Sequence, residues 1–248
     1  LLNKLTVLGP DVNASEYRFV PVDRQTIRYG LGAVKGTGEQ AVNVILKARE
    51  SGGPFKDLFD FCERVDKRMV NRRTIEALIR AGAFDSIDDH RARLMASVGV
   101  AIEAAEQAER NAMQVSLFDV FDGAAAEEHK PQYCESARWV ERQKLAEEKL
   151  ALGFFFSGHP FNEVRQEVSR FARRPLSSLE PRKEPQLLAG LVTGVRTKIT
   201  SRGKMAFVQL DDGTTSLEIS VFNETFETER GKIREDEVLI VEGKVQRD

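Results

Sequence analysis

The sequence YGLGAVKGTGEQAVNVILKA, residues 29–48, places two glycines directly before a stretch with the apolar spacing of an amphipathic helix. Gly36 and Gly38 let the backbone turn tightly and approach a ligand closely. A helix that begins at such a turn presents unpaired N–H groups and the positive end of its dipole. The stretch therefore predicts a turn that can hold one phosphate, with Lys35 supplying a positive charge.

The turn Gly36-Thr37-Gly38 resembles a helix-hairpin-helix motif, which grips the DNA backbone without reading its sequence. Val42 stands near the position where the motif usually has alanine, so the match is not complete. A plain turn between two helices is the alternative. In the motif interpretation, the residues that bind duplex DNA are Lys35, Gly36, Thr37 and Gly38.

Apolar spacing predicts helices through most of residues 30–113, with Asn71 as a helix N-cap and Gly82 as a helix stop. Residues 74–87 offer a second hairpin, but Phe84 stands where glycine is wanted, which favours a structural turn. The arginines around this stretch form either a solvent-exposed face or a phosphate-binding site: Arg72, Arg73 and Arg80. 

A further helix is predicted within residues 137–156, in which Lys144 and Glu148 have the spacing of an i,i+4 ion pair. Residues 173–186 contain three prolines and are interpreted as a linker. 

From Leu187 onward the apolar period changes to two, which predicts four strands and a small Greek-key barrel of the OB type. Asp212 and Gly213 form the predicted tight turn between the second and third strands, and a short helix precedes the fourth. The loop between the first two strands is expected to hold Arg196, Lys198, Arg202 and Lys204. 

Strand alternation places Phe207 and Phe222 outside the barrel if the aliphatic residues point inward. Exposed aromatic rings beside basic residues are a common platform for single-stranded nucleic acid. The alternative is that both phenylalanines pack against a neighbouring domain.

Bulk composition excludes several classes of protein. The 248 residues carry 37 basic and 39 acidic side chains, so nucleic-acid binding must depend on local patches. The two cysteines form no CxxC pair, which fits a reduced, cytosolic compartment, and the three scattered histidines indicate no metal site. No stretch approaches the roughly 20 apolar residues of a membrane span.

Residues 114–121, QVSLFDVF, put closely spaced apolar side chains in what otherwise looks like a surface linker. Gln114, Leu117 and Phe118 follow the pattern Gln-x-x-Leu-Phe, similar to the short motif that docks bacterial proteins on the replication sliding clamp. Leu117 and Phe118 would enter an apolar pocket while Gln114 bonds at its rim, in an extended shape. The alternative is a helix end folded onto its own domain.

Hairpin, clamp-type peptide and OB barrel occur in the order found in the alpha subunits of bacterial DNA polymerase III, the C-family replicative polymerase. The resemblance runs from about Leu8 to Asp248. The chain is similar to that family in the segments DVNASEYRF, YGLGAVKGTGE, LFDFCERVD, NRRTIEALIRAGAFD, LGFFFSGHPF and LEISVFNE. 

The resemblance implies an α+β, multidomain fold: residues 1–29 end the fingers domain, 30–180 form a helix-hairpin-helix domain that binds duplex and clamp, and 187–248 form an incomplete OB domain. It implies a C-terminal piece of a cytoplasmic, nucleoid-associated replicase that tethers the enzyme to DNA and to the clamp's beta subunit. Other replicase subunits would bind regions outside the chain, and no membrane is involved.

The catalytic carboxylates and their two metal ions, Mg²⁺ in the parent enzyme, would lie in an upstream palm domain, so we expect no catalytic residue, no cofactor and no polymerase activity here. Two other interpretations stay open. One is a DNA-binding adaptor or repair protein built from the same modules. The other is a structural scaffold whose modules do not touch DNA.

Overall fold

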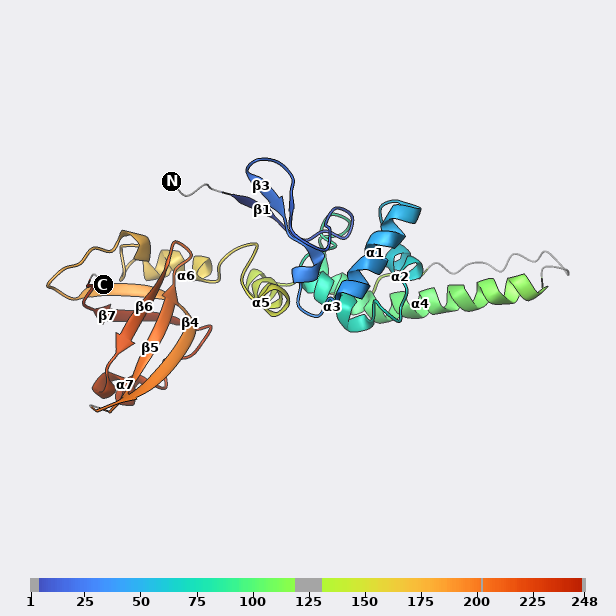
Figure 1. The fold of residues 1–248 in the computed structure, drawn as a ribbon. Coiled ribbons are helices and arrows are strands. Elements are labelled where there is room, and N and C mark those ends of the chain that lie inside the picture. Colours follow the sequence, from blue (N-terminus) through green and yellow to red (C-terminus); the bar gives the residue numbers. More distant parts are fainter. Residues whose placement is uncertain (1–4, 119–130, 202, 247–248) are drawn as a thin grey trace. The chain divides into compact units, whose positions relative to one another are not determined.

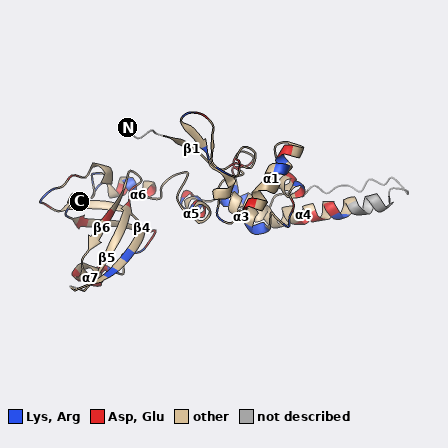
Figure 2. Cartoon of the chain, in the orientation of Figure 1, with Lys and Arg blue, Asp and Glu red and all other residues tan. Residues whose placement is uncertain are grey.

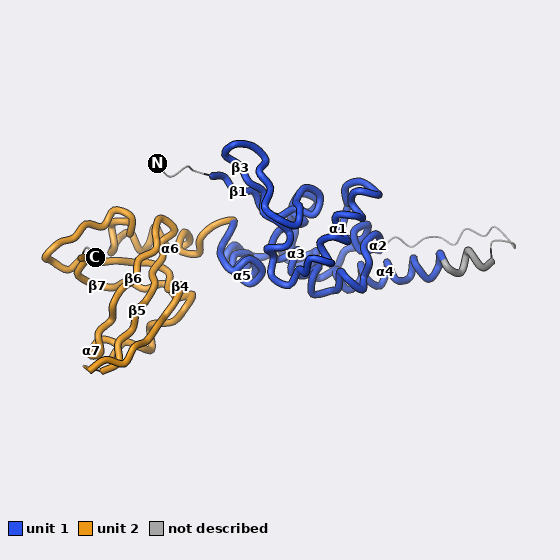
Figure 3. Tube along the Cα trace, viewed as in Figure 1, with its two compact units in different colours: residues 1–156 blue, residues 157–248 orange. Residues whose placement is uncertain are grey.

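The computed structural model describes residues 5–118, 131–201 and 203–246, without the side chains of 113–118. The chain divides into two compact units, residues 1–156 and 157–248, which Figure 3 draws in different colours. Within the described ranges the first unit is mostly helical and the second is built on an antiparallel sheet (Figure 1). The α+β prediction is therefore confirmed.

The first unit begins with a small sheet and continues as helices. The elements of the first unit are β1 (Thr6–Leu8), β2 (Val20–Pro21), β3 (Thr26–Arg28), the 3-10 turn η1 (Leu31–Ala33), α1 (Glu39–Gly52), α2 (Leu58–Arg64), α3 (Arg72–Arg80), α4 (Arg91–Phe118) and α5 (Glu141–Leu152). The sheet has the order β1-β3-β2, with β1 parallel to β3 and β2 antiparallel to it.

The segment before residue 30 is built into the helical core. Val12 and Tyr29 are buried in the same apolar cluster as the inner faces of α1 to α4. Asn13 ties the segment to the loop before α2, because its side chain exchanges hydrogen bonds with the backbone of Phe55. The described part of this segment, residues 5–29, thus packs with the helices of the first unit. The assignment of residues 1–29 to the end of a fingers domain stays a prediction.

Local capping explains where several helices begin and end. The Asn71 side chain accepts a hydrogen bond from the Thr74 amide and starts α3, as predicted. Gly82 follows the end of α3 with a φ of 80°, and Gly153 ends α5 with a φ of 92°. Extended backbone at Val140 delays the start of α5, so this helix is shorter than the one predicted within residues 137–156.

The helix α4 continues beyond the core of its unit. Among the α4 residues whose side chains are described, Ala105 is the last buried one, and residues 106–112 are all exposed. Figure 1 shows this end of α4 running past the neighbouring helices. Lys67 contacts Glu109 at 3.2 Å and supports the exposed stretch from the side.

The second unit contains a four-stranded antiparallel sheet with the order β6-β5-β4-β7. The four predicted strands, the Asp212-Gly213 turn and the short helix are all present. The elements are α6 (Phe161–Val168), η2 (Leu176–Ser178), β4 (Gln186–Thr200), β5 (Gly203–Asp211), β6 (Ser216–Val221), α7 (Asn223–Glu229) and β7 (Val238–Gly243).

The segment between α5 and the sheet belongs to the second unit. Phe161 and Val168 of α6 form a buried cluster with Ala189 of β4. Leu176, within the stretch interpreted as a linker, is buried in the main core of the sheet. Residues 157–180 therefore lie with the sheet and not with the helical unit, where the sequence-based boundaries placed them.

Among the described residues, no helix combines the length and apolar character that crossing a membrane requires.

Candidate nucleic-acid interface

The turn at residues 34–38 joins η1 to α1 and is a hairpin with glycines at both ends of its tip. Gly36 has a φ of 89°, a conformation that favours glycine. Thr37 is buried, whereas Lys35, Gly36 and Gly38 are exposed. Leu31 and Val34 before the turn, and Val42 after it, are buried in the core, so both sides of the hairpin are anchored.

Thr37 holds the hairpin together from inside. Its hydroxyl lies 2.6 Å from the carbonyl oxygen of Leu31 and 2.7 Å from that of Val34. Its amide also donates to the carbonyl of Val34, at 3.2 Å. Both hydrogens of Thr37 are thus bonded within the turn, so this residue shapes the loop and is not positioned to donate to an outside group.

Gly38 is the N-cap of α1, and the first turn of this helix carries no side-chain cap. Its φ of −81° is open to any residue, and a Cβ added there would meet no atom within 4 Å. The fold itself therefore does not require glycine at this position. Gly38, Glu39 and Gln40 at the start of α1 are all exposed, and an exposed helix N-terminus can bind an anion through its N–H groups.

Lys35 stands beside the hairpin at the C-terminal end of α5. Its amide donates to the carbonyl of Ala151 at 2.8 Å. Its ammonium lies close to Gly153, where an added Cβ would come within 3.1 Å of Nζ. The C-terminal end of a helix favours a cation, so α5 helps to hold this charge next to the hairpin.

Residues 74–87 comprise most of α3 and the turn that follows it, and their apolar side chains belong to the core of the first unit. Phe84 is fully buried and stacks edge-on against Phe61. The guanidinium of Arg91 follows the turn and contacts the Asp85 carboxylate at 2.6 Å and the Glu148 carboxylate at 2.9 Å. Burial alone would lower the pKa of Arg91, but the hydrogen bonds and charges of these two carboxylates raise it overall.

The predicted ion pair between Lys144 and Glu148 is wrong. Glu148 is completely buried and accepts from Arg91 and from the Phe156 amide. Glu148 lies three residues after buried Leu145 and therefore on the same, core-facing side of α5. This helical spacing could have indicated from the sequence that Glu148 is buried. The nearby Arg72 and Arg80 contact carboxylates at 2.8 Å and 2.7 Å, so each has a partner within the protein in this structure.

The predicted clamp-binding residues fall at the end of α4. Gln114, Leu117 and Phe118 lie within the helix, but their side chains are outside the described part of the structure. The hypothesis of an exposed docking segment therefore stays a prediction. 

In the second unit, strand register sorts the residues of β4, β5 and β6 onto two faces. Arg196 pairs with Phe207, Lys198 with Met205 and Gln209 with Glu218. Because directly paired residues of an antiparallel sheet share a face, these six side chains lie on one side, here called the outer face. The opposite side carries the buried residues of the sheet core: Ala206, Val208 and Leu210.

Three of the four basic residues that were expected in the loop between the first two strands lie within strands instead. Arg196 and Lys198 lie within β4 and Lys204 lies within β5, because the two strands stay paired as far as Thr200 and Gly203. Figure 2 shows the basic residues along this part of the sheet. Lys204 is on the core side of the strand, where its ammonium lies 5.7 Å from the centre of the Phe226 ring. Arg202 lies outside the described residues.

Two side chains on the outer face hold Arg196 in place. Its guanidinium carbon lies 5.4 Å from the centre of the Phe207 ring, and a guanidinium nitrogen lies 2.6 Å from the Glu218 carboxylate. Phe222 is 69% exposed just after β6. The predicted aromatic residues are thus outside the sheet core, but Glu218 adds a negative charge that sequence reasoning missed.

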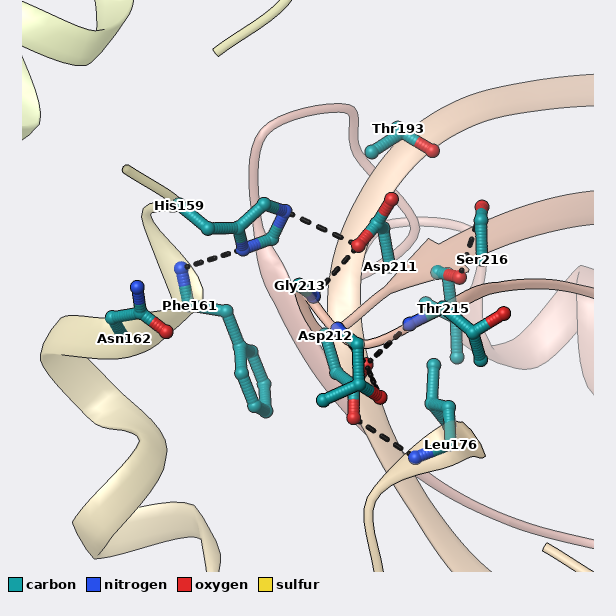
Figure 4. A network of polar contacts seen from close by, with 12 residues as sticks. His159, Phe161, Asn162, Leu176, Thr193, Asp211, Asp212, Gly213, Thr215 and Ser216 are labelled. Atoms are coloured by element: carbon teal, nitrogen blue, oxygen red, sulfur yellow. Dashed lines mark hydrogen bonds and ion pairs between the residues drawn. The ribbon is translucent and has the colours of Figure 1, made fainter. Parts of the chain in front are cut away.

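A polar network ties the start of α6 to the turn between β5 and β6 (Figure 4). The Nε2 atom of His159 lies 3.3 Å from the Asp211 carboxylate, and its Nδ1 accepts from the Phe161 amide. Asp212 accepts from the Leu176 amide at 2.9 Å and from three donors of its own turn. The network fixes the segment before the sheet and explains why that segment is not a linker.

Burial and hydrogen bonding shift the pKa values of two residues in this network. It lowers the pKa of His159, and the charge of Asp211 opposes this shift only in part. Burial would raise the pKa of Asp212, but hydrogen bonds from Thr214, Leu176 and Thr215 lower it overall. Among the described residues, no group of three or more His, Cys, Asp or Glu side chains is arranged to hold a metal ion.

Comparison with known proteins gives matches for both units. The family model described as "Helix-hairpin-helix motif" matches residues 4–94. The model described as "OB-fold nucleic acid binding domain" matches residues 187–248. The predicted order of a helix-hairpin-helix region followed by an OB fold is confirmed.

Curated relatives match nearly the whole chain. The DNA polymerase III alpha subunit of Neisseria meningitidis serogroup A is 49% identical over 246 residues, covering 99% of this chain and 21% of that protein. The subunits of Pseudomonas aeruginosa and Escherichia coli K12 are 41% and 37% identical, with 99% and 98% of this chain and 22% of each relative covered. The resemblance to these subunits is confirmed, and the chain spans about a fifth of their length.

A solved structure, "Structure of RecG bound to three-way DNA junction", covers 83% of this chain and 28% of its own, at 16% identity and a TM-score of 0.26. A score this low supports no conclusion about a shared fold.

Proposed function

We propose that this chain binds DNA during replication, as a region of the alpha subunit of a bacterial replicative DNA polymerase. The observation that carries the proposal is the open first turn of α1 behind Gly36 and Gly38, in a chain that matches such subunits along 99% of its length. Nucleotide transfer and its metal ions would belong to other parts of the subunit. The region would work in the cytoplasm, at replication forks.

The hairpin is proposed to hold duplex DNA by one phosphate. The donors are the backbone N–H groups at the start of α1, and Lys35 adds charge beside them. Gly36 allows the backbone conformation of the turn, and the Thr37 hydroxyl stabilises the turn through its hydrogen bond to the Leu31 carbonyl. Gly38 leaves room for the phosphate, because a larger residue would fill the open space in front of the helix. Such binding is independent of sequence and weakens as salt rises.

The end of α4 is proposed to dock on the sliding clamp through Gln114, Leu117 and Phe118. The exposed residues 106–112 separate this segment from the core of the first unit. Joining a clamp contact to a DNA contact raises the effective concentration of each site, so modest affinities give a stable tether. 

The second unit is proposed to handle the single-stranded template on the outer face of its sheet. Arg196 and Lys198 would meet phosphates, and Phe207 and Phe222 would stack on bases. Arg202 was predicted to contribute as well, whereas Lys204 is on the other side of β5.

Gly38→Asp tests the duplex contact, because it separates folding from binding. Aspartate is a good N-cap and its charge favours the start of α1, so the free energy of unfolding should hold or rise. The same carboxylate would occupy the phosphate position, so duplex binding, measured by fluorescence anisotropy at several salt concentrations, should be lost. The matched control is Gly231→Asp, where an added Cβ also meets nothing within 4 Å. Equal weakening in both variants would contradict the hairpin site.

The clamp contact needs its own experiment. The double variant Leu117→Ala/Phe118→Ala should lose binding to the purified clamp in calorimetry while duplex affinity stays unchanged. Gly38→Asp should show the reverse. If neither the parent chain nor the double variant binds the clamp, and the variant is also less stable, these residues belong to the protein's own fold.

A further inference from the structure

The outer face of the sheet is partly blocked by its own side chains. The proposed single-strand role needs the charge of Arg196 for a phosphate and the ring of Phe207 for a base. In the structure, however, the guanidinium lies over that ring and is bonded to Glu218. Both groups that a strand would use are therefore already occupied.

The positions of the three side chains follow from strand register. Arg196 is directly opposite Phe207, so the guanidinium reaches across the ring from β4 to β5. Glu218 stands on β6, opposite Gln209 and two residues along the strand from the partner of Phe207. This places its carboxylate beyond the ring, where it holds the far end of the Arg196 side chain at 2.6 Å.

We propose that the Arg196–Glu218 ion pair shields the outer face and is exchanged when single-stranded DNA binds. A backbone phosphate replaces the Glu218 carboxylate as the partner of Arg196. As the guanidinium moves to the phosphate, the Phe207 ring is uncovered for a base. This inference rests on the proposed single-strand role of the second unit.

The exposure of the pair makes such an exchange easy. Arg196 is 73% exposed and Glu218 is 43% exposed, so water already screens the attraction between them. Exposed ion pairs of this kind contribute little to stability. The contact therefore favours the position of Arg196 over the Phe207 ring in the absence of DNA, but it is weak enough for a phosphate to replace Glu218.

Lys198 provides an internal comparison on the same face. It lies opposite Met205, and among the described residues no carboxylate is recorded within ion-pair distance of it. Its charge is available without any exchange. Lys198→Ala should therefore weaken single-strand binding by the same factor whether or not Glu218 is present.

The test measures binding of the full chain to oligo(dT) by fluorescence anisotropy. Glu218→Gln should bind about two- to five-fold more tightly than the parent, the range expected from removing an exposed ion pair. The dependence of affinity on salt should become steeper, by up to about 0.7 in the log–log slope, because one more phosphate contact forms without internal competition. In an Arg196→Ala background, Glu218→Gln should have no effect.

Controls separate this inference from its alternatives. Glu227→Gln removes the same charge from an exposed pair with Arg230 on α7, and it should leave affinity unchanged. Weaker binding by Glu218→Gln would overturn the proposal, because Glu218 would then be positioning Arg196 for DNA. A gain that persists without Arg196 would also overturn it, as a general charge effect.

Failure of the underlying function gives a different result. If Phe207→Ala binds oligo(dT) as well as the parent does, the outer face is not the single-strand site, and both proposals are wrong. If Phe207→Ala weakens binding while Glu218→Gln changes nothing, the face binds DNA and only the exchange is wrong.

Discussion

The guanidinium of Arg91, at the start of α4, lies 2.9 Å from the carboxylate of Glu148 in α5, and both side chains are buried. The other carboxylate oxygen of Glu148 accepts from the Phe156 amide, just after α5. This pair joins helices that are separated by 57 positions in the chain. It also fixes α5, whose C-terminal end supports Lys35 beside the hairpin.

Glu148→Gln should therefore destabilise the first unit strongly. The change leaves the partly exposed Asp85 as the one charged partner of the buried Arg91 within the described residues, and breaking a buried pair costs about 3–5 kcal/mol. Urea denaturation measures the effect. The matched control is Glu147→Gln in the next position, which removes a partly exposed partner of Arg80 and should cost about 1 kcal/mol or less. Equal costs at both positions would mean that burial of the pair has no energetic role.

Gly36→Ala should distort the hairpin. A φ of 89° is unfavourable for alanine, so we expect a loss of about 1–2 kcal/mol in the free energy of unfolding. Duplex affinity should fall together with stability. Gly36→Asn should recover part of both, because asparagine tolerates positive φ better than alanine does. Wild-type stability in the alanine variant would show that the turn adapts freely.

The His159 network predicts a loss of stability in mild acid. The pKa of His159 is lowered by burial, so the unfolded chain binds this proton more readily than the folded chain. Stability contributed by neutral His159 is complete above the unfolded pKa of about 6.5 and declines as pH falls through the window down to the folded pKa. Asp211 and Arg165, which face the ring, oppose and reinforce this shift respectively.

Thermal melting of the parent and of His159→Asn between pH 5 and pH 7.5 checks this prediction. Asparagine can still accept from the Phe161 amide but does not titrate, so the variant should lose less stability on acidification. Hydrogen bonds lower the pKa of the Asp212 carboxyl from its ordinary value, which moves its titration further away from this range. If the stability of the two proteins depended on pH in the same way, His159 would not be the group responsible for the loss of stability in acid.

Local signals in the sequence were sufficient for much of the fold. Asn71 and Gly82 mark the ends of α3 because capping depends on neighbouring backbone groups. The period-two pattern after Leu187 gives the strands, since alternation directly reports one buried face. The glycine hairpin was recognisable for the same reason, as its geometry is set within a few residues.

Partners from distant segments could not be predicted in this way. Glu148 has a suitable neighbour in Lys144, yet it pairs with Arg91 across the unit. Glu218 was not connected with Arg196 because only strand register brings them together. The prolines around Leu176 indicated a linker, but its burial depends on a sheet that forms later in the chain.

The packing of α6 and η2 also decides where the second unit can be cut. The OB-fold family match begins at residue 187, yet a fragment starting there would lack the residues that cover Ala189 and the Leu176 amide, one of the donors to the Asp212 carboxylate. Such a fragment would expose apolar surface and would be expected to aggregate on expression. A fragment that begins at residue 157 keeps both, so we expect a stable fragment of the second unit to be longer than the domain that sequence comparison outlines.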